Sequence, residues 1–508
     1  MDPGEILESA GGILPEIAVG GAVVAVLLAE LSPRWRRAVP LLALAALGAG
    51  GALAAAGMEV GGGRPIFRGA LRADGWVSFF RLVFLGSSFL VGVFSIPALR
   101  GWASGRGEFF VMLLACTLGM LLAAGASDLL MVYLSLEFVG LSGYVMAGLR
   151  RRDRGGAEAS LKYLLYGATA SGFLIYGFSF LYGLTGTLQL GEIGRRLAEL
   201  RVPVAMRLLA GMLVLTGFGF KVTAVPFHMW CPDVFEGAPT PVAAFLSVGP
   251  KAAGFAVLAR FLGAVFPPGP AVAGGFDLRL VLALLSALTM AVGNLGALHQ
   301  QNLKRLLAYS TIGHAGYVLL ALAIFTPDAL AALLFYMAVY AVMNLGAFLA
   351  VLVLEDRHGV RTVAECRGLG WRAPVLCGLA TVFLFSLTGI PPTAGFAGKL
   401  LVFSAAIRHG LEGEGGAGAS LAIPLVGVAV VFTVVSLFYY ARILAAMFLS
   451  GPCEGAGEAV SPGTAYGAVL WLLAAGTVGL GLFWDPLDRL ARAAAVSLFA
   501  GSRPPVPG

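Results

Sequence analysis

The chain has 508 residues, of which 59% are hydrophobic and 12% charged, and it contains 71 glycines. This composition excludes a soluble globular domain and is typical of a protein that crosses a membrane many times. The net charge of +7 comes from arginines clustered in short connections between apolar runs. Because no basic face or aromatic-basic motif accompanies it, nucleic acid is not expected as a partner.

The chain opens with acidic residues rather than with the basic region of a secretory signal. Asp2, Glu5 and Glu8 precede the first apolar run, and no small-residue cleavage site follows that run. We therefore expect this run to be retained as the first membrane helix.

Apolar runs of about 20 residues, the length that a helix needs to cross the hydrocarbon core, recur along the chain. They lie at residues 12–30, 38–57, 76–99, 108–126, 128–149, 158–184, 205–230, 240–263, 278–299, 305–325, 328–354, 374–408, 422–449 and 463–484. The sequence therefore predicts an all-α polytopic membrane protein with about 14 transmembrane helices.

Two of these runs are interrupted by proline and glycine. Pro226 follows Lys221 in the run 205–230, and Gly389 and Pro391 precede Lys399 in the run 374–408. Such residues free backbone carbonyls and amides at membrane depth, which is tolerated only where protein or water satisfies them. Broken helices of this kind are typical of ion or substrate paths.

The connections suggest an orientation through a modest excess of basic residues on one side. With the N-terminus outside, the inner connections hold Arg34, Arg36, Arg37, Arg100, Arg106, Arg150, Arg151, Arg152, Arg154, Lys304, Arg305, Arg357, Arg361, Arg367 and Arg372. The outer ones hold Arg64, Arg68, Arg72, Arg195, Arg196 and Arg201. Because the predicted number of helices is even, both termini are expected on the outer, periplasmic side.

Similar spacing of ionisable residues suggests that a bundle is duplicated. Glu137 precedes Lys221 by 84 residues, and His314 precedes Lys399 by 85. We therefore predict four parts of the chain: N-terminal helices at 1–105, a first five-helix repeat at 106–263, a second at 278–450, and a last helix with a tail at 451–508.

Only five lysines accompany 29 arginines, and Lys221, Lys251 and Lys399 lie inside apolar runs. Arginine does not release its proton in proteins, whereas a desolvated lysine does so readily. Glu137 has no charged neighbour within eight positions along the chain, and a carboxylate at the bilayer centre costs at least about 2.5 kcal/mol. We expect these four residues to handle protons, although hydrogen-bonded packing remains an alternative for each.

Three further residues are candidate relay groups. Glu158 is placed four residues before Lys162, as an ion pair on one helix face requires, although Lys162 could equally extend toward the headgroups. His228 follows the first break, and His314 lies among small residues. Each histidine could pass protons near neutral pH or could serve as a hydrogen-bonded packing residue.

A row of Glu137, Lys221, Lys251, His314 and Lys399 joined by water could move protons if the couplings between neighbours alternate. The source of energy is not encoded in this chain, which lacks phosphate-binding, dinucleotide-binding and haem-ligand motifs. Its five cysteines, Cys116, Cys231, Cys366, Cys377 and Cys453, form no metal-binding pattern. A partner protein or an ion gradient is therefore expected to drive the process.

Three stretches of the chain resemble a known family. They are GFKVTAVPFHMWCPDVFEGAPTPVAAFL with the later PKAAGF (218–255), QNLKRLLAYSTIGHAGY (301–317) and LTGIPPTAGFAGK (387–399). They resemble the antiporter-like N subunits of respiratory NADH-quinone oxidoreductase, complex I, over about residues 105–450. The resemblance implies 14 transmembrane helices with two inverted five-helix repeats and broken seventh and twelfth helices. The length argues against the L subunit, and Lys399 in place of a glutamate argues against the M subunit.

The resemblance also implies functional residues and partners. In that family the proposed proton-channel residues match Glu137, Lys162, Lys221, Lys251 and Lys399. No cofactor is expected on this chain, whereas NADH, FMN, iron-sulfur clusters and quinone are expected on partner subunits. Those partners would include M-type and K-type neighbours and the lateral helix of the L-type subunit, in the lipid bilayer of a bacterial inner membrane.

Two functions remain open at this point. The favoured one is a proton-translocating subunit that couples electron transfer from NADH to quinone to proton pumping. The alternative is a subunit of a multi-chain cation/proton antiporter or of a related membrane-bound hydrogenase. A purely structural role in the membrane is a weaker possibility.

Overall fold

The computed structural model describes residues 3–58, 63–102, 105–150, 153–200, 202–267, 278–412, 417–451 and 463–500. Within these residues, 13 helices are long and apolar enough to cross a membrane, and the shorter apolar helix α16 (Pro374–Thr388) adds another. The predicted all-α polytopic fold is therefore confirmed. Arg151, Arg152, Arg201 and Cys453 lie outside the described residues.

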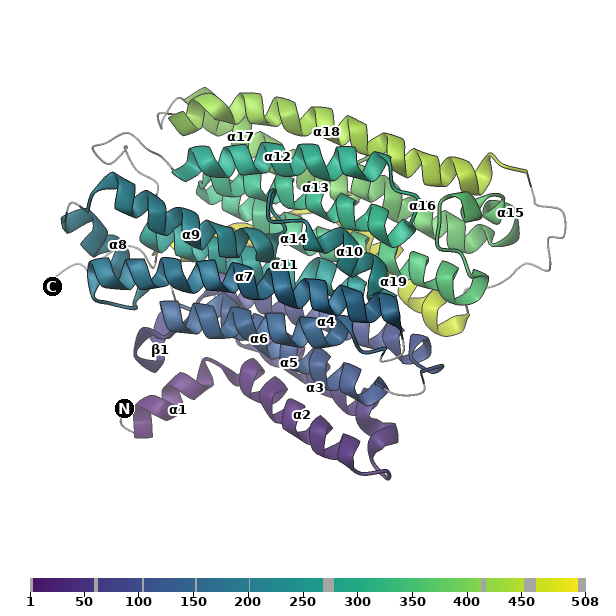
Figure 1. Cartoon of the computed structure of the whole chain (residues 1–508), viewed down its shortest axis with the longest axis horizontal. Coiled ribbons are helices and arrows are strands. Elements are labelled where there is room, and N and C mark those ends of the chain that lie inside the picture. Colours follow the sequence, from purple (N-terminus) through teal and green to yellow (C-terminus); the bar gives the residue numbers. More distant parts are fainter. Residues whose placement is uncertain are drawn as a thin grey trace.

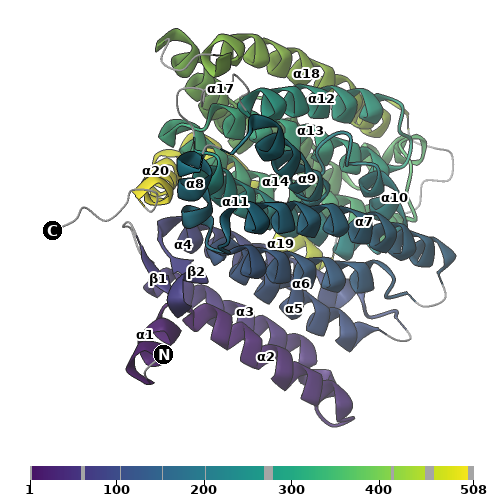
Figure 2. The same ribbon diagram turned by 60° about the vertical axis from the view of Figure 1, so that its left-hand side comes forward.

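The N-terminal part forms one flank of the bundle, drawn in purple in Figures 1 and 2. Its elements are α1 (Pro3–Gly11), α2 (Leu14–Leu31), the short helix η1 (Arg36–Ala38), α3 (Val39–Ala56), a hairpin of β1 (Arg64–Ile66) and β2 (Leu71–Ala73) around η2 (Phe67–Gly69), and α4 (Gly75–Ala98). The Asp74 carboxylate starts α4 by accepting a hydrogen bond from the Val77 amide at 2.9 Å.

The middle and last parts of the chain complete the bundle. The middle part contains α5 (Arg106–Gly125), α6 (Leu129–Ala147), α7 (Arg154–Thr185), α8 (Leu190–Glu199), α9 (Val204–Val222), α10 (Trp230–Gly237) and α11 (Thr240–Val265). The last part contains α12 (Leu278–Leu298), α13 (Leu303–Ile324), α14 (Pro327–His358), η3 (Ala364–Cys366), α15 (Leu369–Arg372), α16, α17 (Ala394–Glu412), α18 (Ala417–Phe448), α19 (Thr464–Leu482) and α20 (Asp485–Ala500).

Three helices form the centre of the molecule. The most apolar stretches of α11, α13 and α14 are 100%, 94% and 89% buried, whereas those of α2 and α18 are only 22% and 28% buried. In Figure 1, α11 and α14 lie between the purple N-terminal helices and the green α18. Polar residues on these three helices are therefore shielded from lipid by the surrounding protein.

Both predicted helix breaks are present. After α9 ends at Val222, Thr223 adopts a left-handed φ of +58°, and the chain resumes as α10 at Trp230. After α16 ends at Thr388, Gly389 takes φ +92° and α17 begins at Ala394. A left-handed residue ends a helix because it turns the next carbonyl away from the axis, and glycine adopts that conformation without steric cost.

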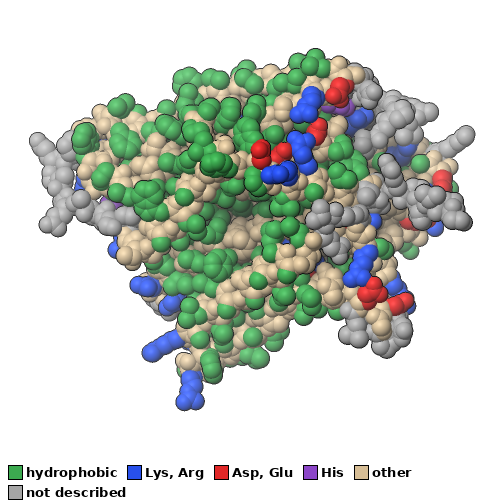
Figure 3. Space-filling model, turned by 180° about the vertical axis from the view of Figure 1, so that it is seen from behind, with side chains coloured by type: hydrophobic (Ala, Val, Ile, Leu, Met, Phe, Trp, Pro, Cys, Tyr) green, Lys and Arg blue, Asp and Glu red, His purple; other side chains and the backbone are tan. Residues whose placement is uncertain are grey.

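The outer surface has the character of a lipid-facing protein. On the face shown in Figure 3, hydrophobic side chains cover most of the surface and charged side chains are confined to a few small groups. Large apolar side chains such as Leu284, Val431 and Trp471 are about 60% exposed on the surface, which would be costly in water but not against acyl chains.

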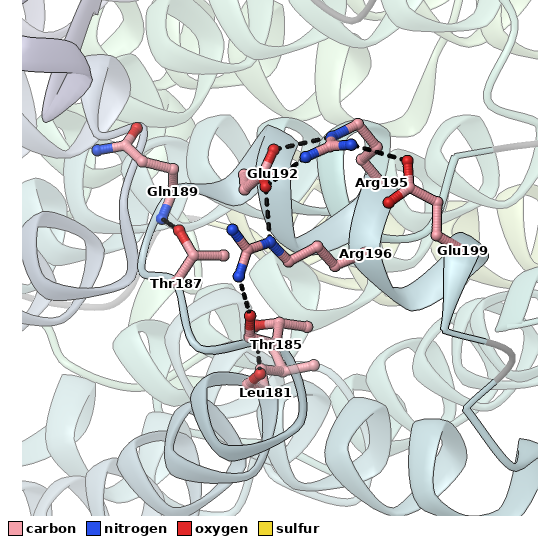
Figure 4. Close-up of polar contacts among 8 residues, drawn as sticks. All are labelled: Leu181, Thr185, Thr187, Gln189, Glu192, Arg195, Arg196 and Glu199. Carbon is pink, nitrogen blue, oxygen red and sulfur yellow. Dashed lines mark hydrogen bonds and ion pairs between the residues drawn. The ribbon is translucent and has the colours of Figure 1, made fainter.

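Helix α8, which was not among the predicted segments, is strongly amphipathic. Leu190, Ile193 and Leu197 are buried against the bundle on one face. The other face carries charged residues that pair within the helix, as Figure 4 shows, and Arg196 Nη1 also donates a hydrogen bond to the Thr185 carbonyl at 2.7 Å. With ten residues it is too short to cross a bilayer, so the search for long apolar runs missed it. Helices α10 and α20 escaped prediction for the same reason.

Candidate functional site

Glu137 on α6 and Lys221 on α9 form an ion pair inside the bundle. Lys221 Nζ lies 3.5 Å from Glu137 Oε1 and donates a hydrogen bond to the Leu136 carbonyl at 3.0 Å. The Ser171 hydroxyl of α7 donates to the same carboxylate oxygen. Lys221 is buried and Glu137 is half-buried. The structure thus gives the isolated carboxylate a cationic partner 84 residues away along the chain.

Lys251, at the middle of α11, is the most enclosed of the lysines, with 2% of its surface exposed. Its Nζ lies 3.9 Å from Cys231 Sγ of α10 and 5.5 Å from the centre of the Phe235 ring. It forms no ion pair with any residue in the described ranges. A cation held by a thiol and an aromatic face is less strongly stabilised than one paired with a carboxylate. Lys251 therefore has a neutral thiol where Lys221 has a carboxylate.

Lys399 and His314 belong to the second half of the chain. Lys399 Nζ donates to the Thr388 and Leu387 carbonyls at 2.8 and 3.2 Å, and it lies 4.7 Å from the centre of the Tyr317 ring. These carbonyls are unpaired because α16 ends there. The end of α16 at the second break therefore supplies the carbonyl groups that bind Lys399. His314 is buried on α13, with its Nδ1 2.7 Å from the Tyr336 hydroxyl.

Lys162 occupies a different environment from the three buried lysines. Its side chain is 38% exposed, and its Nζ lies 2.8 Å from Glu158 Oε1 and 2.7 Å from Asp233 Oδ2. The predicted pairing with Glu158 is present in the structure. Arg305 Nη1 continues the network, at 2.6 Å from Asp233 and 2.9 Å from Glu236.

This network lines a partly open cavity of about 710 Å³. Charged groups of both signs line it, among them Arg150, Lys162, Asp233, Arg305, Glu355 and Arg361. A cavity of this size and polarity accommodates many water molecules. We call this cavity the vestibule, and Lys162 lies at its wall.

Two acidic residues of the vestibule come from a stretch without a predicted helix. Asp233 and Glu236 lie on helix α10, and both pair with Arg305. Burial of Asp233 disfavours its charged form, but hydrogen bonds from Lys162 and Arg305 outweigh burial, so the pKa of this carboxyl lies below its usual range. Lys304, expected to be a simple loop charge, donates a hydrogen bond to the Ala238 carbonyl at 2.9 Å.

A block of aromatic rings joins α6, α7, α9 and α10. The Tyr163 and Trp230 rings stack with centres 4.3 Å apart, and Tyr144 meets Tyr163 edge-on at 4.7 Å. Trp230 Nε1 donates to the Phe220 carbonyl at 3.1 Å. The Tyr144 hydroxyl is buried and has no hydrogen-bond partner among the described residues. Because Tyr163 follows Lys162 in the chain and Phe220 precedes Lys221, this block adjoins both lysines.

The remaining predicted residues play smaller parts in the geometry. His228 lies in the connection between α9 and α10, and its buried Nδ1 has no hydrogen-bond partner in the described part of the chain. Pro226 and Pro391 lie in the two breaks, in the cis peptide bonds Val225–Pro226 and Pro391–Pro392. No hydrogen bond or ion pair joins His228 to a lysine in the described residues.

Ser171, Cys231 and Tyr336 contact the predicted residues but were not predicted themselves. A serine, a cysteine or a tyrosine in an apolar helix is commonly a packing residue, so only the three-dimensional contacts distinguish them. Among the residues that the structure describes, no group of three or more His, Cys, Asp or Glu side chains could hold a metal ion.

Comparisons with known proteins agree with this geometry. The family model for the transmembrane region of NADH:quinone oxidoreductase and Mrp antiporters matches residues 126–412, which is more than half of the chain. The NADH-quinone oxidoreductase subunit N of Anaeromyxobacter sp. (strain Fw109-5) is 40% identical over 516 residues, covering 98% of each chain.

Solved structures show the same fold. A chain of respiratory complex I from Thermus thermophilus with bound aureothin is 33% identical, with a TM-score of 0.75 and coverage of 94% of this chain and 99% of that one. A chain of the Mrp complex from Dietzia sp. DQ12-45-1b, at 24% identity, shares the fold with a TM-score of 0.82 over 97% of this chain and 98% of that one. The chain therefore belongs to the subunit N family of NADH-quinone oxidoreductases, within the wider family of complex I and Mrp antiporter membrane subunits.

Proposed function

We propose that this chain translocates protons across the membrane as a subunit of a complex I, in which electron transfer from NADH to quinone supplies the energy. The buried Glu137–Lys221 pair is the observation that carries this proposal. A buried ion pair is weak evidence for stability, because its desolvation cost can exceed the attraction. A titratable pair in the membrane interior, next to a broken helix, is better explained by proton transfer.

The proposed mechanism uses the different partners of the lysines. When Glu137 is close, it favours the charged form of Lys221, and when their distance increases, burial favours release of the proton. The released proton would pass to Lys251 and then toward Lys399, whose partners are neutral groups. Glu158, Lys162 and the vestibule would supply protons at one side, and His228 and His314 remain candidate relay groups.

The proposed mechanism assigns a role to each of the four predicted parts of the chain. Residues 106–263 would form one antiporter-like repeat around Lys221 and Lys251, and residues 278–450 the second around Lys399. Residues 1–105 would form the N-terminal helices, and residues 451–508 would hold the last helix with its tail. In each broken helix a left-handed residue ends the first segment: Thr223 after α9 and Gly389 after α16. On this basis we propose that the two broken helices hold equivalent positions in the two repeats.

The chain's partners and location are also part of the proposal. NADH, FMN, iron-sulfur clusters and quinone would be bound by other subunits, and M-type, K-type and L-type subunits would be its neighbours in a bacterial inner membrane. In Figure 2, the first and last described helices, α1 and α20, lie toward the same end of the molecule. An even number of spans would place both termini on one side of the membrane, which we propose to be the outer side.

A proton-uptake assay tests the proposed function against the antiporter alternative. Inverted membrane vesicles that contain the whole complex would be supplied with NADH and a quinone, with wild type compared to Lys399→Met. We expect NADH-driven proton uptake in wild type and its loss in the variant, with assembly confirmed on native gels. Sodium-dependent proton movement without NADH or quinone would assign the chain to an antiporter instead.

A further inference from the structure

Lys251 lies on α11 and Lys399 on α17, and both of these helices pack against the central helices α13 and α14. The structure describes no carboxylate in contact with either lysine. The His314 ring of α13 has its centre 5.9 Å from that of Tyr317, the ring that Lys399 contacts. A path along this row therefore needs a further group between His314 and Lys251.

A polar stripe on α14 runs across this region. Tyr336, Tyr340 and Asn344 are spaced four residues apart, so they share one helix face, and each is at most 3% exposed. At one end the Tyr336 hydroxyl meets His314 Nδ1 at 2.7 Å. At the other end Asn344 Nδ2 donates to the Ser247 hydroxyl at 2.7 Å, one turn before Lys251 on α11. The stripe therefore joins the surroundings of the two lysines.

Tyr340 lies at the middle of this stripe. Its ring centre is 5.2 Å from that of His314. Its hydroxyl lies close to the Thr311 side chain of α13 but forms no hydrogen bond of good geometry with a described residue, and Asn344 Oδ1 one turn away is likewise buried without one. An unsatisfied buried polar group costs about 1–3 kcal/mol. Packing alone does not explain two such groups on one helix face.

We propose that the Tyr340 hydroxyl carries protons between Lys251 and His314 and so connects the two lysine-bearing halves of the chain. This inference rests on the proposed proton-translocating function. A water held by Tyr340 and Asn344 Oδ1 would receive a proton from the Lys251 ammonium and pass one to the tyrosine oxygen. The tyrosine would release its own hydroxyl proton to His314 Nε2 in the same step. Tyr340 ends each transfer neutral, with one O–H bond formed and one broken.

The matched substitution is Tyr340→Phe, which keeps the ring and removes only the hydroxyl. Tyr466→Phe is the control, because Tyr466 is equally buried but donates to Asp356 Oδ2 at 3.2 Å, away from the lysine row. A third variant, Tyr340→His, restores a group that can accept and release a proton. All variants would be measured in the intact complex for proton uptake, NADH-quinone electron transfer and melting temperature.

We expect Tyr340→Phe to lower coupled proton uptake by about a hundredfold, the lower end of the range for losing a proton-transfer group. Tyr466→Phe should retain wild-type uptake, melting temperatures should be unchanged, and Tyr340→His should recover part of the uptake. Equal losses in the Phe and His variants would show that the ring packs rather than carries protons, and would overturn the inference.

Lys399→Met separates this inference from the function on which it rests. If Lys399→Met stops proton uptake but Tyr340→Phe does not, the role of Tyr340 is refuted and the proposed function stands. If both variants pump as wild type does, the proposed function fails together with the inference.

Discussion

The three buried lysines of this chain have different partners, and the difference defines what each can do. Lys221 is paired with a carboxylate, Lys251 lies against a thiol, and Lys399 is held by backbone carbonyls. Each partner stabilises the ammonium to a different degree, because a full negative charge attracts more strongly than a dipole. Such graded sites suit the transfer of protons from one lysine to the next.

Replacing Lys221 with arginine tests whether proton release matters more than charge. Lys221→Arg keeps the positive charge next to Glu137, but a guanidinium does not give up its proton. We therefore expect proton uptake by the assembled complex to fall by roughly tenfold or more. The control is Lys304→Arg, whose partner is a single carbonyl at the vestibule, and wild-type uptake is expected there. Equal uptake in both variants would refute proton release by Lys221.

The sequence predicted the residues of the row but not their contacts. Lysines and a glutamate in apolar runs are conspicuous because burying them is costly. Ser171, Cys231 and Tyr336 are ordinary residues in apolar helices, and only the approach of helices distant in sequence gives them polar partners. Residue roles that depend on neutral side chains therefore could not be predicted from one sequence.

At the scale of elements, both breaks lie beside a buried lysine, and the second one supplies the carbonyls at the end of α16 that bind Lys399. The positions of both breaks were predicted from proline and glycine alone, because those residues interrupt a membrane helix for local steric reasons. Helices α8, α10 and α20 were not predicted, because a search for apolar runs of about 20 residues does not find short amphipathic helices.

The glycine at the second break allows a matched test. Gly389 has φ +92°, and a Cβ there would lie 3.0 Å from Lys399 Cδ, whereas Gly359 has φ +67° and open space around it. Alanine at either position costs about 1–2 kcal/mol of backbone strain. We expect Gly389→Ala to reduce proton uptake as well as melting temperature, and Gly359→Ala to affect only the melting temperature. Equal uptake in the two variants would show that the position of Lys399 does not depend on the break.

Helix α8 gives a pH dependence that can be measured locally. Hydrogen bonds from Arg195 and Arg196 lower the pKa of Glu192 from 4.5 to about 2, so these bonds stabilise α8 fully above pH 4.5 and are lost as pH falls toward 2 (Figure 4). Because Glu192 is partly exposed to solvent, salt should weaken the effect. Protection factors of the α8 amides, which correct for the intrinsic pH dependence of exchange, should fall as pH drops from 4.5 toward 2, and less so in Glu192→Gln. A flat profile in wild type would contradict this assignment.

At the scale of the whole molecule, one buried ion pair joins the N-terminal flank to the first half of the bundle. Arg260 Nη2 of α11 lies 2.9 Å from Asp74 Oδ2, and Arg260 Nε donates to the Ala124 carbonyl at the end of α5. The adjacent Trp76 amide donates to the Ser497 hydroxyl of α20. This cluster therefore connects segments from both ends of the chain.

Breaking this pair should destabilise the whole subunit. Arg260→Met leaves the buried Asp74 carboxylate with only the more distant Arg72 Nε, at 3.8 Å, so we expect a cost of up to about 3–5 kcal/mol. The double variant Asp74→Asn/Arg260→Met keeps the helix cap of α4 and removes both charges, so most of the stability should return. The melting temperature of the purified complex measures both. A double variant as unstable as the single one would show that the ion pair is not the source of the loss.

The central claim is that protons cross the membrane through the Glu137–Lys221 pair. The most direct measurement is the number of protons translocated per NADH oxidised, in proteoliposomes holding the complete complex with Glu137→Gln or Lys221→Met. We expect proton translocation to be lost in both fully assembled variants, either at a reduced ratio or together with electron transfer. A wild-type ratio at wild-type rates in both variants would contradict the account and leave the buried pair a structural contact.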